Sequence, residues 1–202
     1  SWFDDATSGE KFTRGRNILD VDKAGAYSFG KSPLYKGQPM EVGPLARMWV
    51  NNKPLSPVGQ AMLREHFGID AVNFRDLGED VAFSLLGRHI ARAEETYLML
   101  DVIEGWLREV KAGEETFSTP VIPGSGEGYA CTEAPRGSLM HFTRVRGGVI
   151  DNYQIMPATL WNTAPRNDKG ELGPIEKCLI GVPVPDIENP VNVARLIRAF
   201  DP

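Results

Sequence analysis

The chain has 202 residues, of which 42% are hydrophobic and 24% charged, values that are ordinary for a soluble globular protein. Its formal net charge of -5 argues against nucleic acid as a partner, since no surplus of basic side chains exists to neutralise phosphates. No apolar run approaches the roughly 18 residues that a transmembrane helix needs, and no signal peptide is visible.

Residues 1–60 are rich in glycine, proline and charge, which predicts a loop-rich segment that packs over a larger body. Three prolines keep this segment extended and turning until Leu45. A helix is predicted over 56–68, because Ser56 can cap it and Pro57 suits the first helical position.

Residues 81–111 give the strongest helix prediction, because apolar residues recur there with a period near 3.6. Gly113 follows where a C-terminal cap is expected, so the helical part of the chain is 56–112. The residues of the expected apolar stripe are Ala82, Leu86, Ile90, Ala93, Tyr97, Leu100, Ile103, Leu107 and Val110. His89 lies near this stripe, and a hydrogen-bonded core histidine is the favoured interpretation.

After Thr119 the helical pattern of the sequence gives way to loop and strand patterns. The segment 120–137, "PVIPGSGEGYACTEAPRG", predicts a loop, and its glycines lack the residues of a phosphate-binding loop and the spacing of a dinucleotide fingerprint. Residues 138–156 predict a β-hairpin that turns at Arg146-Gly147-Gly148. Mostly loop follows over 157–190, and apolar spacing predicts a last helix over 193–200.

Cysteine and histidine give little sign of a metal site. Cys131 and Cys178 are too few for a disulfide framework; one bridge is possible, but two unrelated buried thiols are favoured. His66, His89 and His141 do not stand at metal-ligand spacing from one another or from a cysteine. His141 falls on the first hairpin strand and could brace the loop before it.

Arg136, in "EAPRG", is the most informative candidate. A guanidinium is always charged and presents a fork of five donors, and Pro135 and Gly137 on either side would aim it reproducibly from a loop-to-strand junction. A salt bridge to Glu133, or an ordinary surface arginine, is the simpler alternative that composition alone favours. The residues by themselves show no complete active site.

Five motifs, in order and at similar spacing, resemble the large subunit of nickel–iron hydrogenases over nearly the whole chain. They are "GQPMEVGPLAR" (37–47), "GRHIARAEET" (87–96), "EAPRG" followed by "LMHF" (133–142), "NYQIMPATLWNTAPR" (152–166) and the closing "DP" (201–202). The resemblance implies a mainly α fold with a small β portion. The chain would be the C-terminal part of one large-subunit domain, multihelical and incomplete, with a long central helix. Residues 120–202 would contribute active-site loops, the hairpin and the last helix.

Such enzymes split H2 reversibly into protons and electrons at a nickel–iron centre whose iron carries cyanide and carbon monoxide. In the family, the terminal Asp-Pro leads into Cys-x-x-Cys-x-x-His, and a second Cys-x-x-Cys lies near the N-terminus of the full-length subunit. This chain has neither motif. The resemblance therefore implies that no nickel–iron ligand lies within the chain and that the fragment alone is inactive.

The stop after Pro202 favours the nickel–iron–selenium branch. There the first cysteine of the C-terminal pair is selenocysteine, whose codon is ordinarily a stop. A non-standard residue could equally divide the sequence at that point, and a cysteine at position 203 would remove the selenium hypothesis.

The resemblance also implies roles for individual residues. Arg136 would sit over the metals and face an iron-bound cyanide, with Asp201 pairing with it and Pro135 lining the same pocket. Thr159 would donate a hydrogen bond to the other cyanide. The backbone carbonyl of Ile155 would help to coordinate a Mg²⁺ or Fe²⁺ ion, since such hard cations prefer oxygen ligands.

The implied partners are the rest of the large subunit and a small subunit with iron–sulfur clusters. An export signal on that small subunit would place the enzyme in the periplasm, with membrane contact only through the partner. One alternative is a metal-free relative, as in the quinone-site subunit of respiratory complex I, acting as a structural and coupling module. Another is an independent, non-enzymatic binding domain.

Overall fold

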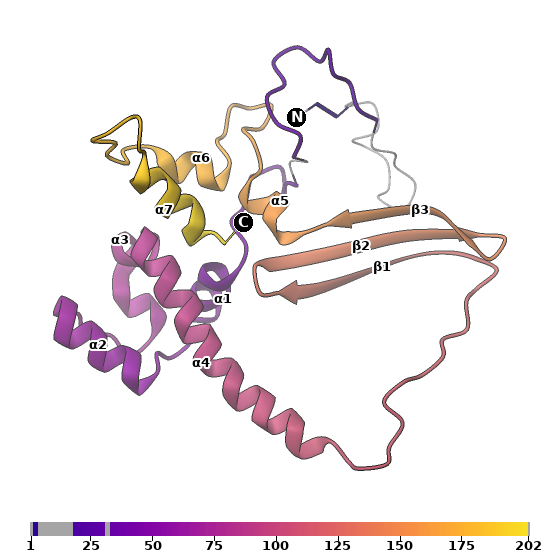
Figure 1. Cartoon of the computed structure of the whole chain (residues 1–202), viewed down its shortest axis with the longest axis horizontal. Helices are drawn as coiled ribbons and strands as arrows, with labels where there is room; N and C mark the ends of the chain where they lie inside the picture. The colour runs from indigo at the N-terminus through magenta and orange to yellow at the C-terminus, as the bar shows by residue number, and fades with distance from the viewer. Residues whose placement is uncertain (1, 4–17, 31–32, 202) are drawn as a thin grey trace. The chain divides into compact units, whose positions relative to one another are not determined.

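The computed structural model divides the chain into two compact units (Figure 1). Unit 1 comprises Ser1–Gly43 and Ile122–Pro202, and unit 2 comprises Pro44–Val121. The structure describes residues 2–3, 18–30 and 33–201. Pro202, the second residue of the closing Asp-Pro, lies outside the described residues. Among the described residues, no helix combines the length and the apolar character needed to cross a membrane.

Unit 2 is helical and has its own small core. Its elements are α1 (Pro44–Asn51), α2 (Pro57–Phe67), the 3-10 helix η2 (Phe74–Leu77), α3 (Gly78–Ala82) and α4 (Leu85–Glu109). Met48 of α1 and Phe74 of η2 are its largest fully buried side chains. Leu63 of α2 and Ala91 of α4 belong to the same hydrophobic cluster, so the start of α4 forms one wall of this core.

Helix α2 confirms the helix predicted over 56–68. The Ser56 hydroxyl accepts a hydrogen bond from the Gly59 N–H at 2.9 Å, which satisfies a donor that the first turn would otherwise leave unpaired. Pro57 occupies the first turn. Gly68 ends the helix in the left-handed conformation, with φ of 66°, which a glycine adopts without steric strain.

The helix predicted over 81–111 is interrupted. A new helix, α4, begins after Ser84, whose hydroxyl accepts from the Gly87 N–H at 3.1 Å, so residues 78–82 form the separate α3. Helix α4 ends at Glu109, because Val110 is extended. The prediction that Gly113 caps the helix is therefore wrong.

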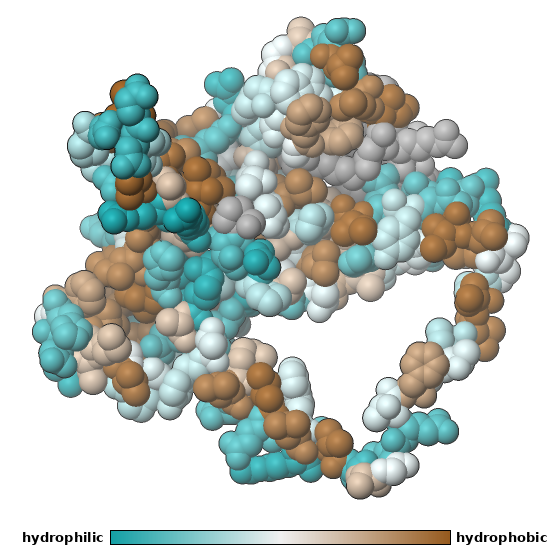
Figure 2. Space-filling model, viewed as in Figure 1, coloured by the Kyte–Doolittle hydropathy of each residue, from teal (hydrophilic) through white to brown (hydrophobic). Residues whose placement is uncertain are grey.

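The predicted apolar stripe is buried only at its beginning. The buried residues of α4 are Gly87, Arg88, Ala91 and Glu94. The stripe residues exposed in this chain are Ala93, Tyr97, Leu100, Ile103, Leu107 and Val110. Those after Glu94 lie on the C-terminal part of α4 and at its end, where Figure 2 shows hydrophobic side chains open to view. His89 is exposed as well, so the prediction of a core histidine is wrong.

Unit 1 contains a three-stranded antiparallel sheet in the order β1-β2-β3 (Figure 1). Its strands are β1 (Ser125–Ala134), β2 (Gly137–Arg146) and β3 (Val149–Met156). The predicted hairpin is confirmed as β2–β3. Gly147 and Gly148 form its two-residue turn with φ of 59° and 76°, the positive pair that a tight right-twisted hairpin requires.

Strand β1 shows that the loop predicted over 120–137 is wrong for most of that segment. Ser125 pairs with Arg146 and the ladder continues without a break to Ala134 and Gly137. Almost every residue of β1 is exposed, so hydrogen bonding to β2, and not burial of alternate side chains, defines this strand. Its glycines and small polar residues therefore carry no period-2 signal. Cys131 is exposed on β1, so the prediction of a buried thiol is wrong for this residue. Cys178 is half-buried, and the two cysteines are not joined by a disulfide.

Three short helices complete unit 1: α5 (Ala158–Asn162), α6 (Pro174–Leu179) and α7 (Val191–Ala199). The first two interrupt the stretch predicted to be mostly loop. Helix α7 confirms the predicted last helix, and it begins directly after Pro190. It buries Leu196 and Ala199, and Phe200 is buried directly after it. The chain is thus mainly α with a small β portion, as predicted.

Candidate functional site

Arg136 lies at the tip of the β1–β2 hairpin. Ala134 and Gly137 pair with each other, so Pro135 and Arg136 alone form the turn between the strands. Both turn residues are exposed. Arg136 is therefore in a tight two-residue turn, not at the junction of a loop and a strand as the sequence suggests. A turn with so few residues leaves the backbone beneath the guanidinium little freedom.

Two glycines let another segment lie directly against this turn. A Cβ on Gly137 would come within 2.5 Å of Val42 Cγ2 and 2.7 Å of the Gly43 nitrogen. A Cβ on Gly43 would come within 2.6 Å of the Arg136 carbonyl oxygen. With φ of 130° and 116°, both residues also adopt backbone conformations that disfavour any other side chain. Residues 42–43 and 136–137 thus touch backbone to backbone.

Asn162, the last residue of α5, holds the segment on the other side of this contact. Its side-chain carbonyl accepts a hydrogen bond from the Val42 N–H at 2.9 Å, and its amide donates to the Val42 carbonyl at 3.0 Å. The residue is only 2% exposed. Sequence reasoning missed Asn162, because no local pattern shows that its partner is 120 positions away.

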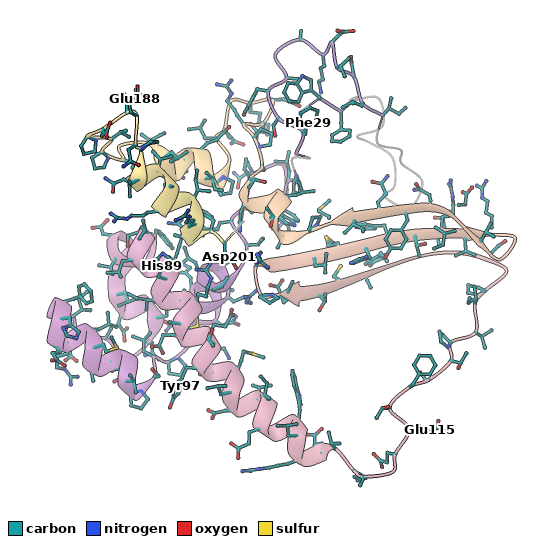
Figure 3. All side chains as sticks on the ribbon, viewed as in Figure 1. Phe29, His89, Tyr97, Glu115, Glu188 and Asp201 are labelled. Atoms are coloured by element: carbon teal, nitrogen blue, oxygen red, sulfur yellow. The ribbon has the colours of Figure 1, made fainter. Side chains whose placement is uncertain are left out.

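Arg136 pairs with Asp201, as the resemblance implies. The Arg136 Nε lies 3.3 Å from Asp201 Oδ2, and the two side chains are 48% and 39% exposed. Figure 3 shows Asp201, the second residue after α7, beside the turned end of β1 and β2. Asp201 has a left-handed backbone, with φ of 54°, and its N–H donates to the Arg198 carbonyl at 3.0 Å. The end of α7 therefore presents the carboxylate to the guanidinium.

The other predicted site residues occupy separate positions. Pro135 precedes Arg136 in the same turn. Thr159 is half-buried in α5, and its carbonyl accepts from both the N–H and the hydroxyl of Thr163. Ile155 is 46% exposed on β3. The described contacts do not join Thr159 or Ile155 to the Arg136–Asp201 pair.

Metal-ligating side chains do not cluster in the part of the chain that the structure describes. No group of three or more His, Cys, Asp or Glu residues there could hold a metal ion. His141 lies across the sheet from Tyr153, with its Nδ1 2.6 Å from the tyrosine hydroxyl. The imidazole is thus a cross-strand partner within the sheet.

A family model described as nickel-dependent hydrogenase matches residues 1–202. The chain belongs to this family. It is 56% identical over 203 residues to the periplasmic [NiFeSe] hydrogenase large subunit of Desulfomicrobium baculatum, an alignment that covers 100% of this chain and 39% of that protein. It is 37% identical to the hydrogenase-2 large chain of Escherichia coli K12, over 88% of this chain and 33% of the relative.

Solved structures agree with this assignment. The Ni-Fe-Se hydrogenase of Desulfovibrio vulgaris Hildenborough in the reduced state matches with 62% sequence identity and a TM-score of 0.93. That match covers 100% of this chain and 42% of the solved chain. The expected hydrogenase large-subunit-like fold is therefore confirmed. The chain spans about two fifths of the length of the Desulfomicrobium and Desulfovibrio proteins and 33% of the hydrogenase-2 large chain.

Proposed function

We propose that this chain forms part of the catalytic subunit of a hydrogenase that splits H2 reversibly into protons and electrons at a nickel–iron centre. The Arg136–Asp201 pair, at 3.3 Å on a braced hairpin turn, is the observation that carries the proposal. It sets a permanent cation at the end of the hairpin, and about half of the arginine side chain remains exposed. The chain thereby contributes a wall of the active-site pocket.

The side chains of the described residues are suited to lining the active-site pocket and do not form a cluster that could bind the metals. The described residues contain no cluster of metal-ligating side chains, so the thiolate ligands would come from the remaining part of the large subunit. A guanidinium suits the anionic cyanide ligands of the iron, because a charge-assisted hydrogen bond is strong and geometrically specific. The centre, when bound, supplies the redox chemistry of H2 cleavage.

The chain's own residues would then act by binding and orienting. Arg136 stabilises negative charge in the pocket, since a cation fixed in advance needs no reorganisation during the reaction. Asp201 orients that guanidinium through its contact with Nε. Pro135 would line the pocket, and the Thr159 hydroxyl would donate to the second cyanide. The carbonyl of Ile155 would contribute to a Mg²⁺ or Fe²⁺ site.

We place the enzyme in the nickel–iron–selenium branch. Identity is 56% and 62% to two proteins whose names specify selenium, against 37% to the hydrogenase-2 large chain. A selenocysteine would then take the place of the first cysteine in the C-terminal ligand pair of the complete subunit. Selenium is the more acidic and polarisable proton acceptor at that position.

The partners follow from the same proposal. The remaining part of the large subunit and a small subunit with iron–sulfur clusters complete the enzyme. Exposed apolar residues on α4, such as Leu100 and Leu107, are suited to burial in such an assembly. A periplasmic location is supported by the name of the Desulfomicrobium relative. Membrane contact, if the enzyme makes any, would be through the partner.

The test is the nickel, iron and selenium content of the complete purified heterodimer, measured together with its H2 oxidation. Nickel, iron and selenium with H2 turnover are expected. Nickel and iron without selenium would keep the hydrogenase and replace selenocysteine by cysteine. A complex without nickel and without H2 turnover would instead establish the structural and coupling module known from metal-free relatives.

A further inference from the structure

We propose that Asn162 is a positioning residue that aims Arg136 at the metal centre, acting through Val42. The inference rests on the proposed function, because it concerns the direction of a guanidinium whose task is set there. The side chains of Arg136 and Asp201 are 48% and 39% exposed, so their ion pair contributes little to the stability of the turn. Asp201 can orient the guanidinium correctly only if the backbone beneath Arg136 is held in place.

The first link joins Asn162 to Val42. The Asn162 amide accepts from the Val42 N–H and donates to the Val42 carbonyl, so one planar group holds both polar backbone atoms of a single residue. With Asn162 only 2% exposed, water has little access to replace either bond. The backbone of Val42 is therefore fixed in both position and rotation.

The second link joins Val42 to the turn that carries Arg136. The missing Cβ of Gly137 would lie 2.5 Å from Val42 Cγ2, and that of Gly43 would lie 2.6 Å from the Arg136 carbonyl oxygen. Neither glycine leaves room for an additional atom. Because closely packed groups transmit displacements, movement of residues 42–43 must move the backbone of 136–137.

The third link is the helix to which Asn162 belongs. Helix α5 is a single short element that carries Thr159 near its start and Asn162 at its end. The Thr163 N–H and hydroxyl both donate to the Thr159 carbonyl at 2.8 Å, which ties the end of α5 to its start. The hydroxyl of Thr159 and the clamp on Arg136 are thus built on one rigid body, so α5 sets the relative geometry of both donors.

The experiment uses the complete heterodimer with Asn162→Asp, which keeps the acceptor for the Val42 N–H and removes the donor to its carbonyl. Asn162→Ala removes both bonds. Val42→Ala keeps both bonds and removes only the side-chain contact with Gly137. We expect nickel and iron content to be unchanged, and turnover to fall by about tenfold to a hundredfold in the Asn162 variants, the loss typical of a misplaced catalytic group. Val42→Ala should show a smaller loss.

Infrared spectroscopy distinguishes positioning from loss of stability. The stretching bands of the cyanide and carbon monoxide on the iron should shift or broaden in all three variants, because a displaced guanidinium changes the field at these ligands. Asn192→Ala is the control, since it removes another asparagine Nδ2–carbonyl bond of 3.0 Å in unit 1. Its bands and turnover should match those of the unaltered enzyme.

A double-mutant cycle is the deciding experiment. In an Arg136→Lys background, Asn162→Asp should cause little further loss, because the group that it positions is already absent. If the turnover loss of the double variant equals the product of the two single losses, the inference is overturned. Unshifted cyanide and carbon monoxide bands in both Asn162→Asp and Val42→Ala would overturn it as well. An unaltered heterodimer without nickel or H2 turnover would instead overturn the proposed function, so the two failures are distinguishable.

Discussion

Arg136 Nε lies 3.3 Å from Asp201 Oδ2, which joins the tip of the β1–β2 hairpin to the second residue after α7. The pair is 48% and 39% exposed, so water screens it. An ion pair in this setting contributes about 0–1 kcal/mol to folding. Its value to the protein therefore lies in the direction that it gives to the guanidinium, and stability and activity should respond differently when it is removed.

Asp201→Asn tests this separation. Asparagine also tolerates the left-handed backbone found at position 201, with φ of 54°, so the substitution removes the charge without adding strain. In the complete enzyme, the thermal unfolding midpoint should stay nearly unchanged. H2 oxidation should fall by about tenfold to a hundredfold, the usual effect of losing a group that orients a site residue. Unchanged turnover would show that Asp201 does not orient Arg136.

Gly137→Ala should destabilise the subunit by at least about 2 kcal/mol, because it combines an unfavourable backbone conformation with overpacking. The new Cβ would lie 2.5 Å from Val42 Cγ2 and 2.7 Å from the Gly43 nitrogen, and φ is 130°. Gly128→Ala on β1 is the matched control, since a Cβ there meets nothing within 4 Å. Thermal unfolding of both variants makes the comparison, and equal midpoints would contradict the backbone contact.

Glu94→Gln tests how α2 is attached to α4. The buried Glu94 carboxylate accepts from the Ser56 N–H at 2.5 Å and from the Ser56 hydroxyl at 3.0 Å. Replacing it by the neutral amide should reduce the free energy of unfolding by roughly 1.5–3 kcal/mol, the range for hydrogen bonds to charged groups.

Glu104→Gln is the control for this variant. Glu104 pairs with Arg108 four residues later on α4, and both side chains are more than 60% exposed. This substitution should change the free energy of unfolding by only about 0.3–0.5 kcal/mol. Chemical unfolding of the two variants should therefore differ clearly, and similar losses would show that burial does not strengthen the Glu94 contact.

Asp76 predicts a pH dependence. The backbone N–H groups of Asn73 and Val72 donate to its carboxylate at 2.7 and 3.1 Å and hold the pKa of Asp76 below its ordinary value of 3.8. A lowered folded-state pKa means that the ionised carboxylate stabilises the fold above pH 3.8. This stabilisation is lost as the pH falls through the lower folded-state pKa.

Asp76→Asn removes the titrating group, so the thermal midpoints of variant and unaltered protein should differ near neutral pH. The two curves should converge as the pH falls below 3.8. A difference that stays constant over the whole acid range would show that the ionised carboxylate is not what caps η2.

Sequence patterns predicted the elements that depend on interactions between residues close together in the chain. Ser56 and Pro57 mark the start of α2, and Gly147-Gly148 marks the turn of the β2–β3 hairpin. Strand β1 escaped prediction because its residues are exposed and its order comes from pairing with β2, a non-local cause. Similarly, the apolar stripe predicted a buried face, but six of its nine residues are exposed in the part of the chain that the structure describes.

The candidate site shows the same difference between local and long-range interactions. The pairing of Arg136 with Asp201 was predicted from the resemblance, and no spacing rule could have shown that the two residues meet. Asn162 and Gly43 were missed because each acts through backbone atoms of a distant segment, contacts that leave no pattern in the sequence. Only the fold shows that residues 42–43 brace the turn that carries Arg136.

The most direct test of the account is H2 oxidation by the complete heterodimer with Arg136→Lys, measured beside its nickel and iron content. Lysine keeps the charge but replaces a fixed planar fork by a mobile point charge. We predict an assembled metal centre with turnover lowered by orders of magnitude. Turnover equal to that of the unaltered enzyme would contradict the account and remove Arg136 from the mechanism.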